Sequence, residues 1–199
     1  MSDETRAPIR ILLAEDNDLV ALTLQEYLSD LGFIVVGVAR TGKEALELAQ
    51  QHSPDLAILD IKLPEMDGTE VAERIYAERP LPIIMVTAFT DRETIRKAER
   101  AGALGYLVKP VTAEALTPAI DIALARFAEI KALREEVDAL HESLEARKLV
   151  ERAKGILMQR LSISEHDAYE RLRQRARDKR AKMKDIAQAI IEAEELLGQ

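Results

Sequence analysis

The chain has 199 residues and a formal net charge of −8, and 47% of its residues are hydrophobic. This apolar fraction can fill a core, which excludes a chain disordered throughout, and the length suits one ordinary domain with a smaller one beside it. The sequence contains no cysteine, which excludes disulfides, thiolate metal sites and cysteine nucleophiles.

The N-terminal residues MSDETRAPIR lack an apolar signal core. No apolar run approaches the roughly 18 residues that a membrane span needs. The absence of cysteine also suits a reducing compartment. We therefore expect a cytoplasmic protein with no membrane partner.

Five short apolar runs lie in the first part of the chain. They are rich in β-branched residues and bounded by Gly, Pro or Asp, which is typical of buried parallel strands. The runs are residues 9–14, 33–38, 56–59, 82–87 and 105–108. Five repeats of strand and helix predict an α/β fold, a flavodoxin-like doubly wound sheet of five parallel strands.

Helix-like stretches separate these runs. They cover residues 18–31, 43–52, 68–78, 91–101 and 113 onward. A short side-chain acceptor precedes four of them, which predicts N-caps at Asn17, Thr41, Asp91 and Thr112. Glycines that suit helix ends are Gly32, Gly102 and Gly105.

Beyond residue 113 the strand pattern does not return, and a heptad seam follows. The seam residues, spaced alternately by three and four, are Ile130, Leu133, Val137, Leu140 and Leu144. The last helix of the α/β domain is expected to run straight into this seam, which either joins two chains or lies on its own domain. The predicted organisation is a domain at 1–126, a coiled-coil linker helix at 127–146 and a small helical domain at 147–199.

The C-terminal part is predicted to form helices at 143–160, 165–180 and 184–197, with Ser164 as an N-cap. Residues 147–184 contain 13 Lys and Arg but only 5 Asp and Glu, although the whole chain is acidic. A basic block on an acidic body indicates a polyanion-binding module, unless the charges only solvate a helical face.

Chemically active side chains stand at the ends of four predicted strands. They are Glu15, Asp16, Asp60, Thr87 and Lys109. In a sheet of order 2-1-3-4-5 the three carboxylates meet where the strand order reverses, which is where such sheets bind ligands. Clustered carboxylates without an adjacent cation repel each other, so a divalent ion is expected, and hard oxygen ligands suit Mg²⁺. With the lysine and the hydroxyl nearby, Asp60 is the candidate acceptor of a phosphoryl group.

The motifs LLAEDND, LDIKLPEMDG, VTA and YLVKP resemble the receiver domain of bacterial two-component response regulators. The resemblance implies that Asp60 takes phosphate from a phosphohistidine of a sensor histidine kinase. It implies Mg²⁺ bound by Glu15, Asp16, Asp60 and the backbone carbonyl of Lys62. The remaining implied roles are phosphate pairing by Lys109 before a cis peptide to Pro110, and a switch pair of Thr87 and Tyr106. The first acidic position is Glu here, where the family often has Asp.

The run RKLVERAKGILM, the pattern S-E-x-D-A-Y-x-x-L-R and the pattern R-x-K-M-x-D-I-A resemble the ANTAR domain. The resemblance implies a three-helix module that binds paired RNA hairpins in a nascent transcript and causes transcription antitermination. Tyr169 either stacks on a base or packs in the core. The candidate RNA contacts are Lys148, Arg152, Lys154, Arg175, Arg180 and Lys184.

Two other function classes remain to be weighed. A phosphorylation-controlled DNA-binding regulator is the alternative, although the turn at 161–164 follows a helix that continues the seam, which is unusual for a helix-turn-helix. An aspartyl-phosphate hydrolase would want a second carboxylate two residues after the nucleophile, where Lys62 stands. We therefore expect a signalling protein that catalyses only its own phosphoryl transfer and hydrolysis. Phosphorylation is expected to favour a homodimer through the seam.

Overall fold

The computed structural model describes residues 8–88 and 92–197. The chain forms two compact units, Met1–Lys131 and Ala132–Gln199, called here the N-terminal and C-terminal units. Their boundary lies inside the predicted linker 127–146, while the three-part organisation itself stays a prediction. Among the described residues, no helix combines the length and apolarity that crossing a membrane requires.

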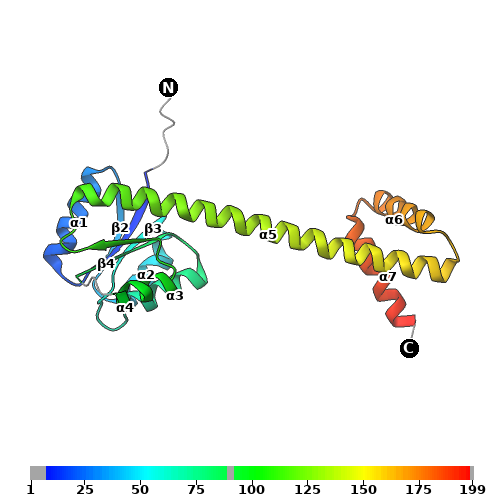
Figure 1. Cartoon of the computed structure of the whole chain (residues 1–199), viewed down its shortest axis with the longest axis horizontal. Helices are drawn as coiled ribbons and strands as arrows, with labels where there is room; N and C mark the ends of the chain where they lie inside the picture. Colours follow the sequence, from blue (N-terminus) through cyan, green and yellow to red (C-terminus); the bar gives the residue numbers. More distant parts are fainter. Residues whose placement is uncertain (1–7, 89–91, 198–199) are drawn as a thin grey trace, which may run out of the picture. The chain divides into compact units, whose positions relative to one another are not determined.

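A five-stranded parallel sheet forms the centre of the N-terminal unit (Figure 1). Its strands are β1 (Arg10–Ala14), β2 (Ile34–Ala39), β3 (Leu56–Asp60), β4 (Ile83–Thr87) and β5 (Gly105–Val108). The order is β2-β1-β3-β4-β5, so the predicted fold class and strand order are confirmed. This order places β1 and β3 side by side, although β2 separates them along the chain.

Helices cover both faces of the sheet because successive side chains of a strand point to opposite faces. The helices are α1 (Asp18–Asp30), α2 (Gly42–His52), α3 (Gly68–Glu78), α4 (Arg92–Arg100) and the first turns of α5 (Ala113–Leu161). Leu12 belongs to the core shared with α2, α3 and α4. Its neighbour Leu13 belongs to the core shared with α1 and α5.

Most of the predicted helix ends are confirmed at the positions that the structure describes. The Asn17 side chain accepts from the backbone N–H of Leu19 at 3.0 Å, and that of Thr41 accepts from Glu44 at 3.2 Å. Gly32 and Gly102 both have a φ of 83°, which suits helix ends. The prediction for Gly105 was wrong, because this residue begins β5. Thr112 directly precedes α5, and Asp91 lies outside the described residues.

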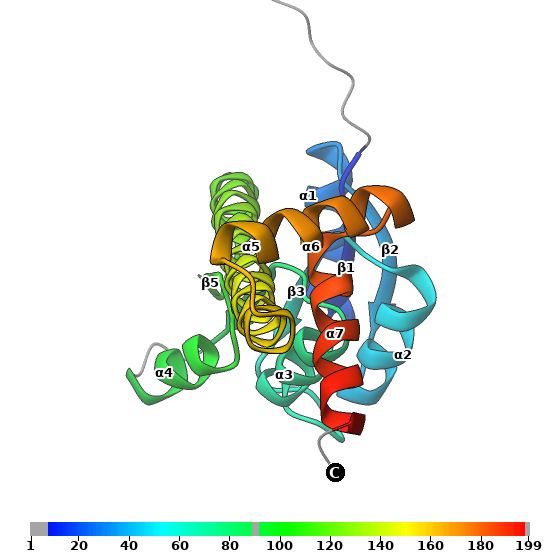
Figure 2. The same cartoon turned by 90° about the vertical axis from the view of Figure 1, so that its right-hand side faces the viewer.

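The C-terminal unit is helical. As predicted, the last helix of the α/β domain runs through the seam, and α5 continues without interruption to Leu161. The separate helix predicted at 143–160 was therefore wrong, since no Gly or Pro between 119 and 154 ends α5 there. Next come α6 (Glu165–Lys179) and α7 (Met183–Leu197), which run crosswise to each other (Figure 2).

A small core holds these three helices together. Its buried side chains are Ala153 from α5, Leu172 from α6, and Ile186, Ala187 and Ile191 from α7. The predicted N-cap at Ser164 is confirmed: its Oγ accepts from the backbone N–H of Asp167 at 3.1 Å and donates to the Asp167 carboxylate at 2.7 Å.

Candidate functional site

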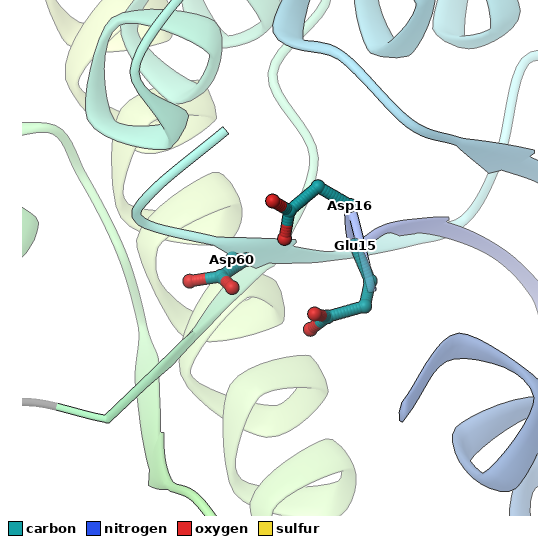
Figure 3. Close-up of side chains that lie close together, drawn as sticks. All are labelled: Glu15, Asp16 and Asp60. Carbon is teal, nitrogen blue, oxygen red and sulfur yellow. The ribbon is translucent and has the colours of Figure 1, made fainter. Parts of the chain in front are cut away.

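Three carboxylates meet at the carboxyl edge of the sheet (Figure 3). Glu15 and Asp16 directly follow β1, and Asp60 is the last residue of the adjacent β3. One ligand oxygen from each lies within 4.8 Å of the others. Glu15 and Asp60 are buried, whereas Asp16 is exposed. Solvent therefore reaches the cluster at Asp16.

Lys109, which follows β5, projects into the same cluster. Its Nζ lies 2.6 Å from a Glu15 carboxylate oxygen and 2.5 Å from Asp60 Oδ2. Lys109 thus lies in the pocket where the sequence analysis expected it, and it pairs directly with two of the three carboxylates. The ammonium offsets one of the three negative charges, so an excess remains for a divalent ion to balance. Oxygen donors in this number, with solvent reaching Asp16, fit Mg²⁺, which keeps several of its waters.

The electrostatics of the cluster follow from its burial. Burial raises the pKa of the Glu15 carboxyl, and the Lys109 ammonium opposes this increase only in part. Burial alone would lower the pKa of Lys109, but hydrogen bonds to Asp60 and Glu15 raise it above its ordinary value. Lys109 therefore stays a cation in the absence of a metal ion.

The loop after β3 presents Asp60 in a fixed position. The backbone N–H of Lys62 donates to Asp60 Oδ1 at 3.1 Å, and that of Gly68 donates to the Ile61 carbonyl at 2.8 Å. A Cβ on Gly68 would lie 2.0 Å from the Asp60 carbonyl oxygen, so only glycine lets α3 begin this close to the strand end.

The other candidates from the receiver resemblance lie on neighbouring strands. Thr87 ends β4 and is buried, and its carbonyl accepts from the backbone N–H of Lys109 at 2.8 Å. The bond between Lys109 and Pro110 is cis, as the resemblance implies. Tyr106 lies in β5 opposite Met85 and packs against the core shared with α2, α3 and α4.

Arg40 is a residue of this site that the sequence analysis missed. Its guanidinium donates to the Glu15 carbonyl oxygen at 3.0 Å and pairs with Asp18 at 2.7 Å. Its backbone N–H donates to a Glu44 carboxylate oxygen at 2.6 Å. Its position just after β2 could have predicted this role, because the end of β2 lies beside the end of β1, where Glu15 follows.

The basic candidates of the C-terminal unit have different surroundings. Lys148 pairs with Glu145, Arg152 pairs with Glu195, and Lys184 pairs with Glu142. Arg175 and Arg180 are exposed. Lys154 differs from the rest, since only 9% of its side chain is exposed and its ammonium pairs with Glu151 at 2.9 Å and Glu165 at 2.6 Å.

The predicted seam lies along α5 and is open to solvent in the single chain. The exposed fractions are 61% for Leu133, 49% for Val137, 57% for Leu140 and 56% for Leu144. Ile130, at its start, is partly buried. Apolar side chains in a continuous row on an exposed helix are typical of a protein-binding surface.

A parallel sheet of this order, with a buried aspartate, further carboxylates and a lysine at its switch point, defines a receiver domain. The sequence pattern of the response regulator receiver domain matches residues 11–121, more than half of the chain. That of the ANTAR domain matches residues 138–191.

The relatives agree with this class. The transcriptional regulatory protein PdtaR of Mycobacterium tuberculosis is 45% identical over 189 residues, which is 95% of this chain and 92% of that protein. The chain therefore belongs to the family of response regulators that join a receiver domain to an ANTAR domain, which are signalling proteins. A methylesterase/glutaminase of Myxococcus xanthus is 41% identical over 138 residues, 68% of this chain and 37% of that protein.

Solved structures share the fold of the N-terminal unit. A receiver domain of a modulated diguanylate cyclase from Desulfovibrio desulfuricans has a TM-score of 0.57 and 40% identity, covering 61% of this chain and 97% of that one. The receiver domain of the putative regulator NarL from Mycobacterium tuberculosis has a TM-score of 0.57 and 32% identity, covering 59% and 98%.

Proposed function

We propose that this protein accepts a phosphoryl group on Asp60 from a phosphohistidine of a sensor kinase, and that phosphorylation controls its binding to RNA. The observation that carries the first part is the grouping of Asp60, Glu15, Asp16 and Lys109 within one pocket. In the transfer, a carboxylate oxygen of Asp60 forms a bond to phosphorus while the bond from phosphorus to the histidine nitrogen breaks.

Each group of the pocket has a separate task. Glu15, Asp16, Asp60 and the Lys62 carbonyl would hold Mg²⁺, which supplies positive charge against the phosphoryl oxygens. Lys109 gives up part of its contact with Asp60 and pairs with a phosphoryl oxygen instead.

We assign the response to phosphorylation to the switch pair. The Thr87 hydroxyl turns toward the phosphoryl group, and Tyr106 follows it inward. Thr87 ends β4 close to Lys109, and Tyr106 lies on the adjacent β5 three positions before Lys109, so a change at the pocket can pass from one to the other.

The output is binding of hairpins in a nascent RNA, so that a terminator does not form. The family relationship and the basic block at 147–184 support this output. Lys148, Arg152, Arg175, Arg180 and Lys184 stay candidate RNA contacts. Lys154 is assigned a structural role instead, because its ammonium is held between two carboxylates.

A binding experiment separates RNA from the DNA alternative. A pool of tandem RNA hairpins with randomised loops is enriched on the wild-type chain and compared with duplex DNA at the same salt concentration. The proposal is supported if the chain binds the enriched RNA more tightly than duplex DNA. It also requires that phosphorylation tightens RNA binding further and that Asp60→Asn abolishes this gain in affinity. Tighter binding of duplex DNA contradicts it.

The homodimer is part of the same proposal, with the seam as its contact. Sedimentation with and without acetyl phosphate and Mg²⁺ is expected to show a dimer when the protein is phosphorylated. Leu140→Glu places a charge in the seam and should keep the chain monomeric, whereas Glu135→Gln on the same helix should not. A dimer formed equally well by Leu140→Glu would contradict the assignment of the seam.

A further inference from the structure

An open groove of about 620 Å³ lies in the C-terminal unit, between α5 and the connection of α6 to α7. Its floor on α5 consists of small or aliphatic side chains at helical spacing, Ala139, Ser143, Ala146 and Val150. Small residues here leave room above the helix, so the groove is a consequence of the α5 sequence.

The opposite wall provides an aromatic ring and an apolar side chain. Tyr169 of α6 lines the groove and is 40% exposed, so its ring is not simply a core residue. Met183, at the start of α7, lines the groove as well. A planar ring beside apolar surface is the usual arrangement for stacking a nucleic acid base.

The rim of the groove is charged. Arg147, Lys182 and Lys184 contribute three cations, and Glu142 and Glu151 contribute two carboxylates. Both carboxylates already form ion pairs within the chain: Glu142 pairs with Lys184, and Glu151 pairs with Lys154. The rim therefore carries a net positive charge, which suits the phosphates on either side of a bound base.

We propose that this groove binds one unpaired base of an RNA loop, with Tyr169 stacking on the base and Arg147 and Lys182 contacting the flanking phosphates. The inference rests on the proposed RNA-binding function and assigns its base-binding site. A base within a duplex exposes only its edge. The face of a base can stack on the Tyr169 ring only when the base is unpaired and splayed out, as in a loop.

The ion pair between Glu142 and Lys184 adds a regulatory element to the groove. Both residues line it, and Lys184 lowers the pKa of Glu142, which keeps the carboxylate charged. An incoming phosphate competes with Glu142 for Lys184. Glu142→Gln should therefore release Lys184 and bind RNA several-fold more tightly.

The test uses the full-length chain and hairpin RNA enriched from the randomised pool, together with the same RNA carrying abasic sites at its loop positions. The wild type should bind at least one abasic RNA about 10-fold more weakly. Tyr169→Ala should bind the intact RNA about 10-fold more weakly and lose this discrimination, while Tyr169→Phe keeps both. Lys182→Gln should reduce the salt slope of binding by about one.

Two tryptophan variants distinguish a blocked groove from a chain that fails to fold. Ser143→Trp fills the groove from an exposed position and should block binding, whereas Glu145→Trp, which does not line it, should bind normally. If the pool yields no enriched RNA, the proposed function itself fails. If the wild type discriminates abasic RNA but Tyr169→Ala and Ser143→Trp bind as it does, the base is held elsewhere and only this inference is overturned.

Discussion

The guanidinium of Arg40 donates a hydrogen bond of 3.0 Å to the backbone carbonyl of Glu15. It thereby ties the end of β2 to the loop that carries two of the three clustered carboxylates. The accompanying ion pair with Asp18 is exposed and contributes little by itself. The value of Arg40 therefore lies in fixing the position of Glu15 and Asp16.

Replacing Arg40 should weaken metal binding. Arg40→Gln is expected to raise the dissociation constant for Mg²⁺ about 10-fold, which is typical when a residue that orients metal ligands is lost. Isothermal titration calorimetry measures this constant without any phosphoryl transfer. Arg74→Gln is the matched control, since Arg74 pairs with an exposed neighbour one turn away on α3. An unchanged constant for Arg40→Gln would show that the loop holds its shape unaided.

Replacing Lys109 should make the fold depend on metal. Lys109→Met leaves Glu15 and Asp60 close together without their shared cation, and we expect a loss of about 1–3 kcal/mol of stability in EDTA. Mg²⁺ should restore more stability to this variant than to the wild type, because it supplies the missing charge. Thermal melts with and without Mg²⁺ measure both effects. Lys97→Met, which breaks an exposed pair, should change neither; equal melts for both variants would refute the prediction.

Replacing two glycines by alanine should change the stability of the protein in opposite directions. At Gly68 the new Cβ would meet the Asp60 carbonyl, so Gly68→Ala should cost about 1–3 kcal/mol and slow phosphorylation by acetyl phosphate. At Gly155, inside α5, a Cβ meets nothing within 4 Å, so Gly155→Ala should stabilise by about 0.5–1 kcal/mol. Urea denaturation gives both values. A harmless Gly68→Ala would mean that the loop after β3 can move away from α3.

The pairing of Lys154 with Glu165 should make the C-terminal unit sensitive to pH. Hydrogen bonds between them lower the pKa of Glu165 and raise that of Lys154. The contribution of Glu165 is therefore present above its unfolded pKa and lost as the pH falls through its lowered value. The contribution of Lys154 is present below its unfolded pKa and lost as the pH rises through its raised value.

Glu165→Gln should accordingly lower the melting temperature at neutral pH, and the difference from the wild type should vanish in acid. Lys154→Met should lower it as well, without steepening or flattening the salt dependence of RNA binding. Lys148→Met is the control for that second measurement, because Lys148 is exposed. A reduced salt slope for Lys154→Met would return Lys154 to the RNA contacts.

The sequence by itself determined the five strands and, for a sheet of order 2-1-3-4-5, the grouping of Glu15, Asp16 and Asp60. These follow from local periodicity together with the general geometry of parallel sheets, in which the strand ends meet at one edge. The Asn17 and Ser164 caps were predictable for the same reason, since each depends on residues two or three positions away.

Only the tertiary structure showed that Lys109 pairs directly with Glu15 and Asp60, and that Arg40 holds the loop that carries Glu15 and Asp16. The position of Lys109 after a strand predicted that it lies near the carboxylates, but its direct contact with Glu15 spans 94 positions and that of Arg40 spans 25, and no local pattern encodes such contacts. The same holds for the surroundings of Lys154, a candidate RNA contact whose ammonium folding brings between Glu151 and Glu165. The role of a charged side chain depends on the partners that packing brings to it, and those partners come from other elements.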